Sequence, residues 1–473
     1  MARRTKIIAT LGPRSRDEDV LGELIAAGVD VVRLNFAHDS LESHARTAKL
    51  VQGIAKESGR VIGLMADLPG PKMRTGRIQG DEVRLTSGGE LTLVSADVEG
   101  DGDKVSTSVD DLSELVSRGD EIYLADGAIV LRVRSLDRGD VVTEVLRGGI
   151  LRSRKGMHLP SAERSVQAFT AEDRAALACA LELEVDLVGL SFIRSADDLD
   201  RVRAAVPAGD RAPRLVAKIE TKSAAENLEK IIPAADVVMV ARGDLGIQVP
   251  LRLVPLIQKR IIRVCNEWGR PVITATQMLE SMTDAPLPTR AEVTDVANAV
   301  LDGTDALMLS EETAVGQDPV SAVRTMSEIA GCAEEALPKE WRAVREEARE
   351  DRVSWAVARA AVRAAEALEV AAILCPTRSG ATPRRVAASR PGMPVVALSS
   401  DHRALGPLAL VWGVVPLLVH STPTAYGLNE EVARVTGAAL EAGVVSPGDL
   451  VTVVAGTAGP RAGSTDFMRI VRL

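Results

Sequence analysis

Aromatic residues are scarce in this chain, at 2% of 473 residues, so leucine, valine, isoleucine and alanine must fill its core. Cysteine is scarce too. The cysteines are Cys179, Cys265, Cys332 and Cys375, and they show neither C-x-x-C spacing nor a paired pattern. A disulfide framework and a cysteine-based zinc site are therefore not expected. We interpret the cysteines as reduced, mostly buried residues of a cytoplasmic protein.

Features of a membrane protein or a nucleic-acid-binding protein are also missing. Residues 1–16 lack the uninterrupted apolar core of a signal peptide, because Arg14 and Arg16 soon follow the first apolar run. The longest apolar run, residues 408–419, contains Pro416 and is shorter than the ~20 residues that span a bilayer. A net charge of −9 and a pI near 5.4 argue against a basic nucleic-acid footprint. We predict a soluble, cytoplasmic protein with no membrane and no nucleic acid as partner.

The standard nucleotide-binding and hydrolase motifs do not occur in the sequence. It contains no glycine-rich P-loop motif, no Rossmann G-x-G-x-x-G, no G-x-S-x-G and no H-E-x-x-H. A P-loop or Rossmann mode of nucleotide binding is therefore not expected. Any anionic substrate must be bound by a local cluster of arginine, lysine and metal.

Apolar, β-branched runs alternate with helical patterns through the first two-thirds of the chain. Eight such runs occur, at residues 6–10, 31–35, 61–67, 186–192, 214–220, 236–242, 271–276 and 305–310. Amphipathic helical patterns lie between most of them, for example at residues 41–57 and 171–183. Eight β/α units that close on themselves form a (β/α)8 TIM barrel, which is the α/β fold that we predict. A doubly wound open sheet is the alternative.

The chain is long enough for two or three domains, and two parts of it lie outside the barrel pattern. Residues 70–168 contain short alternating strands and no helical period. We therefore expect a small β-rich lid domain inserted between barrel parts at residues 1–69 and 169–338. A charged, linker-like stretch at residues 339–351 precedes helix and strand patterns, which predict a C-terminal α/β domain of regulatory type at residues 352–473.

Charged residues end two of the most apolar runs. Lys218 and Glu220 close one, and Arg242 and Asp244 close the next. The carboxyl ends of barrel strands meet at one rim, so these side chains should lie together. Glu220 and Asp244 would hold Mg²⁺ or Mn²⁺, since oxygen ligands favour hard cations, and Lys218 would neutralise a phosphoryl group or an enolate. Two separate surface ion pairs are the structural alternative.

Further polar residues follow the other runs, and they include Arg33, Asn35, His38, Asp67, Lys72, Arg74, Gly243 and Thr276. Arg33 and Arg74 suit a phosphate, which the guanidinium fork can bind in a bidentate manner. Gly243 would let a substrate carboxylate approach the backbone, and Thr276 would orient a water or a proton. His38 and His158 lie in predicted loops near the cleft, where a nucleotide contact and a structural role both remain open.

These motifs resemble the pyruvate kinase family across essentially the whole chain. Arg33-Leu-Asn-Phe-Ala-His38 is similar to the family's R-x-N-F-S-H, and Lys155-Gly-Met-His-Leu-Pro160 is similar to K-G-V-N-L-P at the end of its lid domain. The family's signature segments are matched by Lys218-Ile-Glu220 and by residues 239–246, 274–282 and 291–303. A set of matches in this order is highly specific.

The resemblance implies transfer of the phosphoryl group of phosphoenolpyruvate to ADP, giving pyruvate and ATP in glycolysis. By matched position, Glu220 and Asp244 would hold the catalytic Mg²⁺. Lys218 would stabilise the transferring group, with Arg33 and Arg74 nearby. The reaction depends on positioning and electrostatic stabilisation, which agrees with the interpretation of the residues themselves.

The resemblance also implies roles for the remaining rim residues. Thr276 would belong to the group around the enolate carbon that is protonated. Gly243 and Asp244 would border the substrate carboxylate, and His38 and Lys155 would approach the nucleotide. The family is usually a homotetramer, so a homotetramer is expected here.

Two residues near the family's monovalent-cation site depart from its pattern. Lys72 replaces a glutamate beside this site, where Asn35 and Asp67 are retained. Ala37 replaces a serine whose hydroxyl is a K⁺ ligand. Because a lysine ammonium can stand where K⁺ would, whereas both together would repel each other, we expect an enzyme that does not require K⁺.

Two other function classes remain open. A metal-dependent barrel lyase or aldolase acting on a pyruvate enolate would also need a lysine or arginine, a glutamate and an aspartate at strand ends, but neither a lid nor a C-terminal domain. A catalytically weak regulatory homologue is suggested by Ala37, Lys72 and Glu311. Glu311 stands where the family usually has glycine, and nothing in the sequence explains its effect.

The C-terminal domain carries a loop similar to the one where the family binds phosphorylated effectors. The loop contains Thr377, Ser379, Gly380 and Thr382. Hydroxyl groups and backbone N–H groups at a helix start suit a phosphate, so a sugar phosphate or a nucleotide monophosphate is a candidate allosteric effector. Residues 456–465 would close this pocket. A plain strand-to-helix turn is the alternative.

Overall fold

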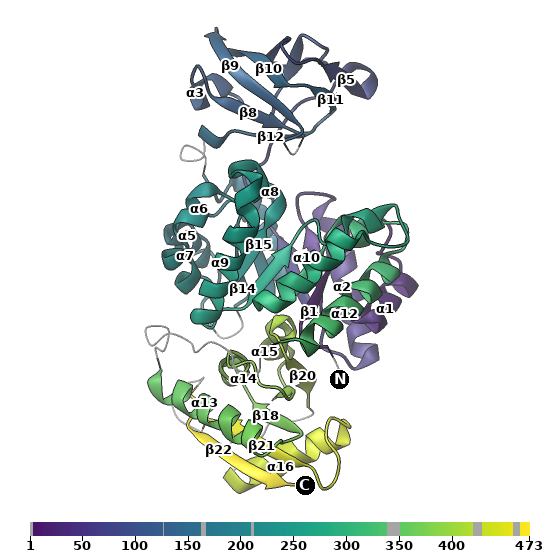
Figure 1. Ribbon diagram of the computed structural model, residues 1–473, viewed down its shortest axis with the longest axis vertical. Coiled ribbons are helices and arrows are strands. Elements are labelled where there is room, and N and C mark those ends of the chain that lie inside the picture. The colour runs from purple at the N-terminus through teal and green to yellow at the C-terminus, as the bar shows by residue number, and fades with distance from the viewer. Residues whose placement is uncertain are drawn as a thin grey trace.

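The computed structural model describes residues 3–125, 127–161, 167–209, 212–337, 351–419, 428–456 and 464–473. Three parts follow one another along its long axis (Figure 1): a β-rich part, a barrel surrounded by helices, and a C-terminal α/β part. The barrel lies in the middle. One of its ends therefore faces the β-rich part, and the other faces the C-terminal part.

Eight parallel strands form a closed barrel, which confirms the predicted barrel fold and excludes the open sheet. They are β1 (Lys6–Thr10), β2 (Val31–Asn35), β3 (Gly63–Asp67), β13 (Leu187–Leu190), β14 (Arg214–Ile219), β15 (Val237–Ala241), β16 (Val272–Ala275) and β17 (Ala306–Leu309). β1 pairs with both β2 and β17, which closes the ring. The strands are buried on both faces, since one face lines the barrel interior and the other packs against helices.

Several strands are shorter than the apolar runs that predicted them. The run at residues 186–192 contains only β13, because Phe192 has a positive φ of 56° that a strand does not permit. Glu220, Arg242 and Thr276 follow the ends of β14, β15 and β16 directly. The charged and hydroxyl residues therefore lie just beyond the strands, at one rim.

Helices lie between the strands and cover the barrel. They are α1 (Glu18–Ala27), α2 (Leu41–Ser58), α4 (Ala171–Glu182), α5 (Ala196–Arg203), α6 (Lys222–Glu226), α7 (Leu228–Ala234), α8 (Arg242–Gln248), α9 (Val254–Glu267), α10 (Arg290–Asp302), α11 (Glu311–Ala314) and α12 (Pro319–Glu335), with 3-10 turns η3 (Leu251–Leu253) and η4 (Glu280–Thr283). Local residues define their ends. Thr170 and Thr289 form capping boxes at the starts of α4 and α10, and Gly28 and Gly59, both with positive φ, end α1 and α2.

Between β3 and α4 the chain forms separate sheets with a hydrophobic core of their own. One sheet has the order β4-β12-β8-β9-β10-β6-β7, and β11 pairs with β5. The elements are β4 (Met73–Arg74), η1 (Gln79–Asp81), β5 (Glu82–Leu85), β6 (Glu90–Val94), β7 (Lys104–Ser106), α3 (Leu112–Leu115), β8 (Glu121–Leu124), β9 (Ile129–Asp137), β10 (Asp140–Arg147), β11 (Gly149–Arg152) and β12 (Gly156–His158). The exact domain limits stay predictions.

The C-terminal part is a five-stranded sheet in the order β20-β19-β18-β21-β22, flanked by helices. Its elements are α13 (Arg352–Ala367), β18 (Ala372–Pro376), α14 (Ala381–Ala387), β19 (Val395–Ser399), α15 (His402–Leu405), η5 (Gly406–Leu410), β20 (Val414–Leu418), α16 (Leu428–Glu441), β21 (Leu450–Ala455) and β22 (Phe467–Arg472). This confirms the predicted α/β fold, although β22 was not predicted. The predicted charged linker lies outside the described residues except for Asp351.

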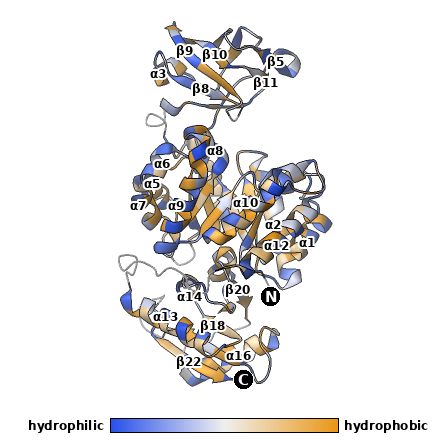
Figure 2. Cartoon of the chain, in the orientation of Figure 1, coloured by the Kyte–Doolittle hydropathy of each residue, from blue (hydrophilic) through white to orange (hydrophobic). Residues whose placement is uncertain are grey.

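The C-terminal part closes one end of the barrel. Ala409 and Leu410 of η5 belong to the same buried cluster as Ile8, Val31 and Met65, whose side chains fill the barrel interior. Figure 2 shows the apolar strands enclosed by helices with polar outer faces. A functional site at the carboxyl ends of the strands must therefore lie at the opposite end, which faces the β-rich part. None of the helices in the described ranges has the length and apolarity needed to cross a membrane.

Candidate active site

Lys218 lies at the centre of a buried charged cluster at this rim. Its Nζ is 2.7 Å from Glu220 Oε1 and 3.2 Å from Asp67 Oδ1, and it donates a hydrogen bond of 2.8 Å to Ser191 Oγ. Burial disfavours the charged amine, but the two carboxylates outweigh this effect and raise the pKa of Lys218 above its ordinary value. Lys218 is therefore a fixed positive charge at neutral pH.

Arg33 and Asp67 form a second ion pair beside this lysine. The Nε and Nη2 of Arg33 lie 2.8 and 2.7 Å from Asp67 Oδ2, and Nη1 donates to Thr10 Oγ1 at 3.0 Å. Burial opposes ionisation of Asp67, but Lys218 and Arg33 lower its pKa below the ordinary value. Arg33 thus has its orientation fixed by protein partners, while its side chain still lines the cavity where a phosphate was predicted.

Glu220 is the carboxylate best suited to a metal ion. Its Oε2 accepts a hydrogen bond of 2.8 Å from the Phe192 backbone, and its buried Oε1 forms the 2.7 Å ion pair with Lys218. Burial raises the pKa of Glu220, Lys218 opposes this effect, and Asp244 raises the pKa further. A divalent cation would relieve this repulsion between carboxylates. Within the described ranges, no three or more histidine, cysteine, aspartate or glutamate residues are grouped so that they could hold a metal ion by themselves.

Thr276 follows β16 and contacts the first turn of α8, which begins directly after β15. Its Oγ1 accepts a hydrogen bond of 2.8 Å from the Gly243 backbone N–H and donates one of 2.6 Å to the Ala275 carbonyl. Both Thr276 and Gln277 have positive φ, at 68° and 53°. The buried guanidinium of Arg242 donates to the carbonyl groups of this bend. Gly243 and Thr276 are thus brought together as predicted from their strand ends.

A small cavity of about 80 Å³ joins these residues at the rim. It is lined by Arg33, Asn35, Lys72, Lys218, Glu220, Asp244 and Thr276, among others. Most of the predicted catalytic and metal-binding residues therefore share one cavity. The Oδ1 of Asn35 accepts a hydrogen bond of 3.2 Å from the Ala37 backbone, so Ala37 lies at the edge of the same region.

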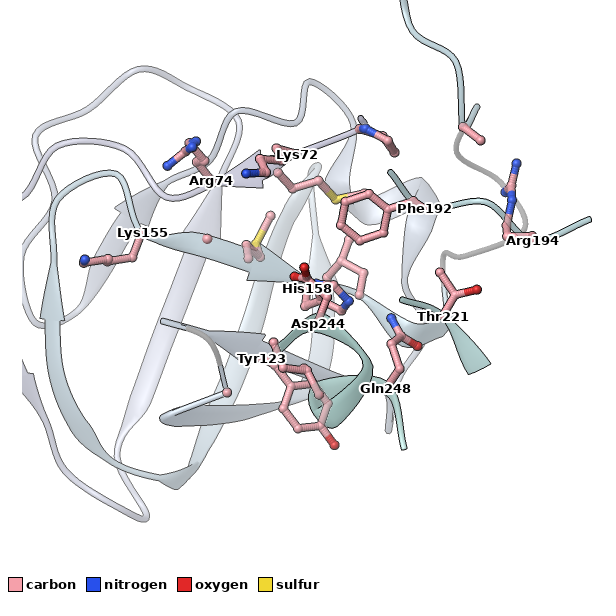
Figure 3. Close-up of a pocket in the computed structure, with 18 of the residues that line it drawn as sticks. Lys72, Arg74, Tyr123, Lys155, His158, Phe192, Arg194, Thr221, Asp244 and Gln248 are labelled. Carbon is pink, nitrogen blue, oxygen red and sulfur yellow. The ribbon is translucent and has the colours of Figure 1, made fainter. Parts of the chain in front are cut away.

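A wider cleft of about 300 Å³ continues from the cavity toward the β-rich part, and Lys72, Phe192 and Asp244 line both. Figure 3 shows Arg74 and Lys155 on one side of the cleft, Arg194 and Thr221 on the other, and His158 and Asp244 between them. Arg74 donates to the Arg154 carbonyl at 3.2 Å and does not line the small cavity. It was predicted to act beside Arg33, but it belongs to the outer cleft.

The cleft is electropositive on the side of Lys72. Burial lowers the pKa of His38, and Lys72 and Arg74 lower it further, so His38 is neutral at physiological pH. Burial and then Lys218 lower the pKa of Lys72, against the opposing effect of Asp244 and the other carboxylates. His38, Lys155 and Glu311 also line this cleft. An anionic ligand such as a nucleotide phosphate fits this charge distribution.

The predicted effector loop connects β18 to α14, in the C-terminal part. Gly380 N–H donates to Thr377 Oγ1 at 2.9 Å, and the Oγ1 atoms of Thr382 and Thr465 are 2.7 Å apart. The Ser379 carbonyl accepts a hydrogen bond of 3.3 Å from Arg214 at the start of β14. These residues lie beyond the closed end of the barrel and do not join the rim cluster. Of the segment predicted to close their pocket, residues 457–463 lie outside the described residues.

Ser191 and Phe192 were not identified from the sequence, although they contact the central cluster. Ser191 accepts the hydrogen bond from Lys218, and Phe192 donates its backbone N–H to Glu220. The Phe192 ring also lies 5.6 Å from the ring of His158 in the β-rich part. Their position at the end of a predicted strand could have indicated a place at the rim. They were missed because neither residue is charged.

Comparison with known proteins identifies relatives along the whole chain. Residues 2–323 match the family model "Pyruvate kinase, barrel domain", and residues 355–471 match "Pyruvate kinase, alpha/beta domain". The chain is 41% identical to a pyruvate kinase of Geobacillus stearothermophilus, over 99% of this chain and 80% of that protein. Identity is 39% with a pyruvate kinase of Thermococcus litoralis, over 99% of this chain and 98% of that protein. It is also 39% with one of Mycobacterium tuberculosis, over 100% and 99%.

The barrel, its rim of buried charges and these relatives define an enzyme of the phosphotransferase class. More particularly, the chain belongs to the pyruvate kinase family. The resemblance found in the sequence motifs is thereby confirmed.

Proposed function

We propose that this protein transfers the phosphoryl group of phosphoenolpyruvate to ADP, giving pyruvate and ATP in glycolysis, with Mg²⁺ or Mn²⁺ as cofactor. One observation carries the proposal: Lys218 and Glu220 are in buried contact within a cavity that Asp244 also lines. Membership of the pyruvate kinase family supports these substrates. A fixed ammonium beside two carboxylates suits a reaction in which charge must be neutralised on a transferring phosphoryl group.

Glu220 and Asp244 would hold the divalent cation, whose role when bound is to neutralise phosphate charge and orient the reactants. Lys218 would face the transferring phosphoryl group, since Asp67 and Ser191 restrict its position. Arg33, oriented by Asp67, would bind the same group from the side of β2. These residues act mainly by holding charges in place, because phosphoryl transfer needs little covalent chemistry from the protein.

The remaining residues would bind the ends of the two substrates. The Gly243 backbone and Asp244 would border the carboxylate of phosphoenolpyruvate, and Thr276 would serve the protonation of the enolate. Arg74, His38 and Lys155 would contact the phosphates of ADP, because they line the outer cleft that continues from the cavity. Because His38 is neutral, it would donate a hydrogen bond to a phosphate without adding a positive charge beside Lys72.

We also propose that K⁺ is not required, because Lys72 supplies the monovalent charge. Lys72 lines the same cavity as Asn35, and its electrostatic neighbours include Asp244, Asp67 and Glu220. An ammonium at this position balances these carboxylates, whereas K⁺ added beside it would be repelled.

The first test measures pyruvate formation from phosphoenolpyruvate with and without ADP, in K⁺-free buffer with Mg²⁺ or with EDTA. We expect ADP-dependent and Mg²⁺-dependent turnover. Glu220→Gln should lower kcat by about 100-fold or more, because one oxygen ligand and its charge are lost. The control is Glu226→Gln, which changes an exposed carboxylate on α6 paired with Lys222 and should leave kcat unchanged.

The alternatives give different outcomes in this assay. A lyase or aldolase would leave phosphoenolpyruvate unchanged and would release pyruvate, without ADP, from an aldol substrate added in its place. A regulatory homologue would show no turnover in either buffer, even with sugar phosphates or AMP added, and Glu311 in the cleft is the structural feature that favours it. Either result would contradict the proposed phosphoryl transfer.

Three further parts of the proposal concern the whole protein. A phosphorylated allosteric effector would bind the loop of Thr377, Ser379, Gly380 and Thr382, which activation by AMP or sugar phosphates would test. The assembly would be a homotetramer, as family membership suggests, which analytical ultracentrifugation would test. The cytoplasmic location stays a prediction from composition, which cell fractionation would test.

A further inference from the structure

We propose that Arg242 is a positioning residue: its guanidinium, oriented by Asp295, fixes the backbone bend that holds the Thr276 hydroxyl against Gly243. This inference rests on the proposed function, in which Thr276 serves the protonation of the enolate. Arg242 was noted in the sequence as a charge at a strand end. Its contacts show that it acts on the backbone of a neighbouring strand end.

The bend after β16 has an unusual backbone. Thr276 and Gln277 both have positive φ, at 68° and 53°, and they are adjacent in the chain. This region is unfavourable for most side chains and particularly so for β-branched threonine. Two such residues in succession persist only where their surroundings determine the conformation.

Arg242 supplies these surroundings. Its Nε lies 3.2 Å from the Ala275 carbonyl and 3.1 Å from the Thr276 carbonyl, and its Nη2 lies 2.5 Å from the Thr276 carbonyl and 3.0 Å from the Gln277 carbonyl. Three successive carbonyl groups therefore converge on one planar cation. Arg242 is only 9% exposed, so water is poorly placed to replace these bonds. A lysine could not replace them either, because its ammonium lacks the flat fork of the guanidinium.

The opposite edge of the guanidinium is held by two other helices. Its Nη1 lies 2.5 Å from Asp295 Oδ2 on α10 and 3.4 Å from Gln258 Oε1 on α9. Asp295 thus orients the guanidinium through Nη1, while the carbonyl groups of the bend accept hydrogen bonds from the Nε and Nη2 edge. The bend is connected through Arg242 to the helical layer of the barrel.

The result is a fixed hydroxyl in the cavity. Thr276 Oγ1 accepts a hydrogen bond from Gly243 N–H at 2.8 Å and donates one to the Ala275 carbonyl at 2.6 Å. These two hydrogen bonds fix the orientation of the hydroxyl group. Gly243 directly precedes Asp244, and Thr276 lines the same cavity as Lys218. Once the phosphoryl group has left, the enolate carbon must accept a proton. A displaced hydroxyl would slow that step more than it would weaken binding of phosphoenolpyruvate.

The test separates proton transfer from substrate binding. Exchange of the methyl hydrogens of pyruvate with D₂O, in the presence of Mg²⁺ and ATP, reports enolisation directly. Arg242→Lys should slow this exchange by about 100-fold, while KM for phosphoenolpyruvate changes by less than about threefold. The solvent isotope effect on kcat should rise. An unchanged exchange rate in folded Arg242→Lys would overturn the proposal.

A double-mutant cycle identifies the residue through which Arg242 acts. In a Thr276→Ala background, Arg242→Lys should slow exchange little further, because the hydroxyl that it positions is already gone. Multiplicative effects in the double variant would overturn the proposal. If Arg242→Lys does not fold, the same cycle uses Asp295→Asn, which removes the carboxylate charge that orients the guanidinium.

Arg390→Lys is the matched control. Arg390 is another buried arginine with several hydrogen bonds, to Asn266, Gly303 and Asp305 at the far end of the barrel. Its substitution should lower the unfolding temperature without changing the isotope effect or the exchange. Failure of the proposed function is recognised separately, since the wild type would then form no pyruvate from phosphoenolpyruvate and ADP.

Discussion

Lys218 is buried where an isolated lysine would tend to lose its proton, yet Asp67 and Glu220 keep it charged. If it neutralises the transferring group, Lys218→Met should lower kcat by about 100- to 1,000-fold, the usual effect of removing one electrostatic contact to a transition state. Lys259→Met is the control, because Lys259 pairs with Asp302 on the protein surface. Steady-state kinetics and a circular dichroism melt of each variant check this expectation. Equal kcat values for the two folded variants would contradict it.

Lys72 gives a second prediction for a single side chain. Lys72→Glu exchanges a cation for a carboxylate beside Asp67, Asp244 and Glu220, so the region then needs an added cation. We expect at least roughly tenfold lower kcat without K⁺ and recovery when K⁺ is added. Lys72→Met is the matched control, which loses the ammonium but gains no carboxylate for K⁺ and should recover less. Strong activation of the wild type by K⁺ would refute the role assigned to Lys72.

Strand β13 has a glycine, Gly189, at the position paired with Asp67 of β3, where a larger residue would not fit. A Cβ on Gly189 would lie 2.6 Å from Asp67 Oδ1, the atom next to Lys218. Gly189→Ala should therefore displace Asp67, cost about 1–3 kcal/mol of unfolding free energy and lower kcat. Gly22→Ala on α1 is the control, since no atom lies within 4 Å of its added Cβ and alanine favours the helix by up to about 1 kcal/mol. Urea unfolding and kcat, measured for both variants, test this prediction. Retention of full kcat by Gly189→Ala would show that β3 can move.

The start of β13 gives a prediction about pH. Burial raises the pKa of Asp186, just before this strand, from 3.8 to about 7. The folded state then binds this proton more tightly than the unfolded state does, so unfolding free energy falls as the pH rises from about 4 to about 7. The fall is at most on the order of 4 kcal/mol. Asp186→Asn keeps an acceptor for the Leu64 N–H and should remove most of this slope in urea titrations. A slope equal to that of the wild type would contradict the assignment.

The elements that the sequence predicted well are those with simple periodicity. The eight barrel strands, α2 and α4 follow directly from apolar runs and amphipathic spacing. β22 was missed because its Arg469 and Arg472 face solvent at a sheet edge, where the apolar alternation is weak. Likewise, the meeting of Lys218 with Glu220 could be inferred from strand ends. The hydrogen bonds that Ser191, Phe192 and Arg242 make could not, because they depend on backbone bends after the strands.

At the scale of the whole molecule, the barrel and the C-terminal part share buried contacts. Leu410 is fully buried against barrel residues. Leu410→Ala should lower the unfolding free energy by about 2–5 kcal/mol through the cavity that it leaves. It should also destabilise both parts in one calorimetric transition. Leu418→Ala, at a position that is 44% exposed, should change stability by less than about 0.5 kcal/mol. Two separate transitions, with only the C-terminal one shifted, would show that the parts unfold independently.

The closure of the barrel by η5 has a consequence for synthesis on the ribosome. Ala409 and Leu410 lie about 100 residues after β17, the last barrel strand to be made. At ~5–20 residues per second, roughly 5–20 s separate translation of the last strand from translation of the residues that seal its lower end. During this interval the nascent barrel has a complete ring of strands but an open apolar end. Chaperones that bind exposed apolar surface should therefore associate with ribosomes that have passed β17 and should leave once η5 emerges.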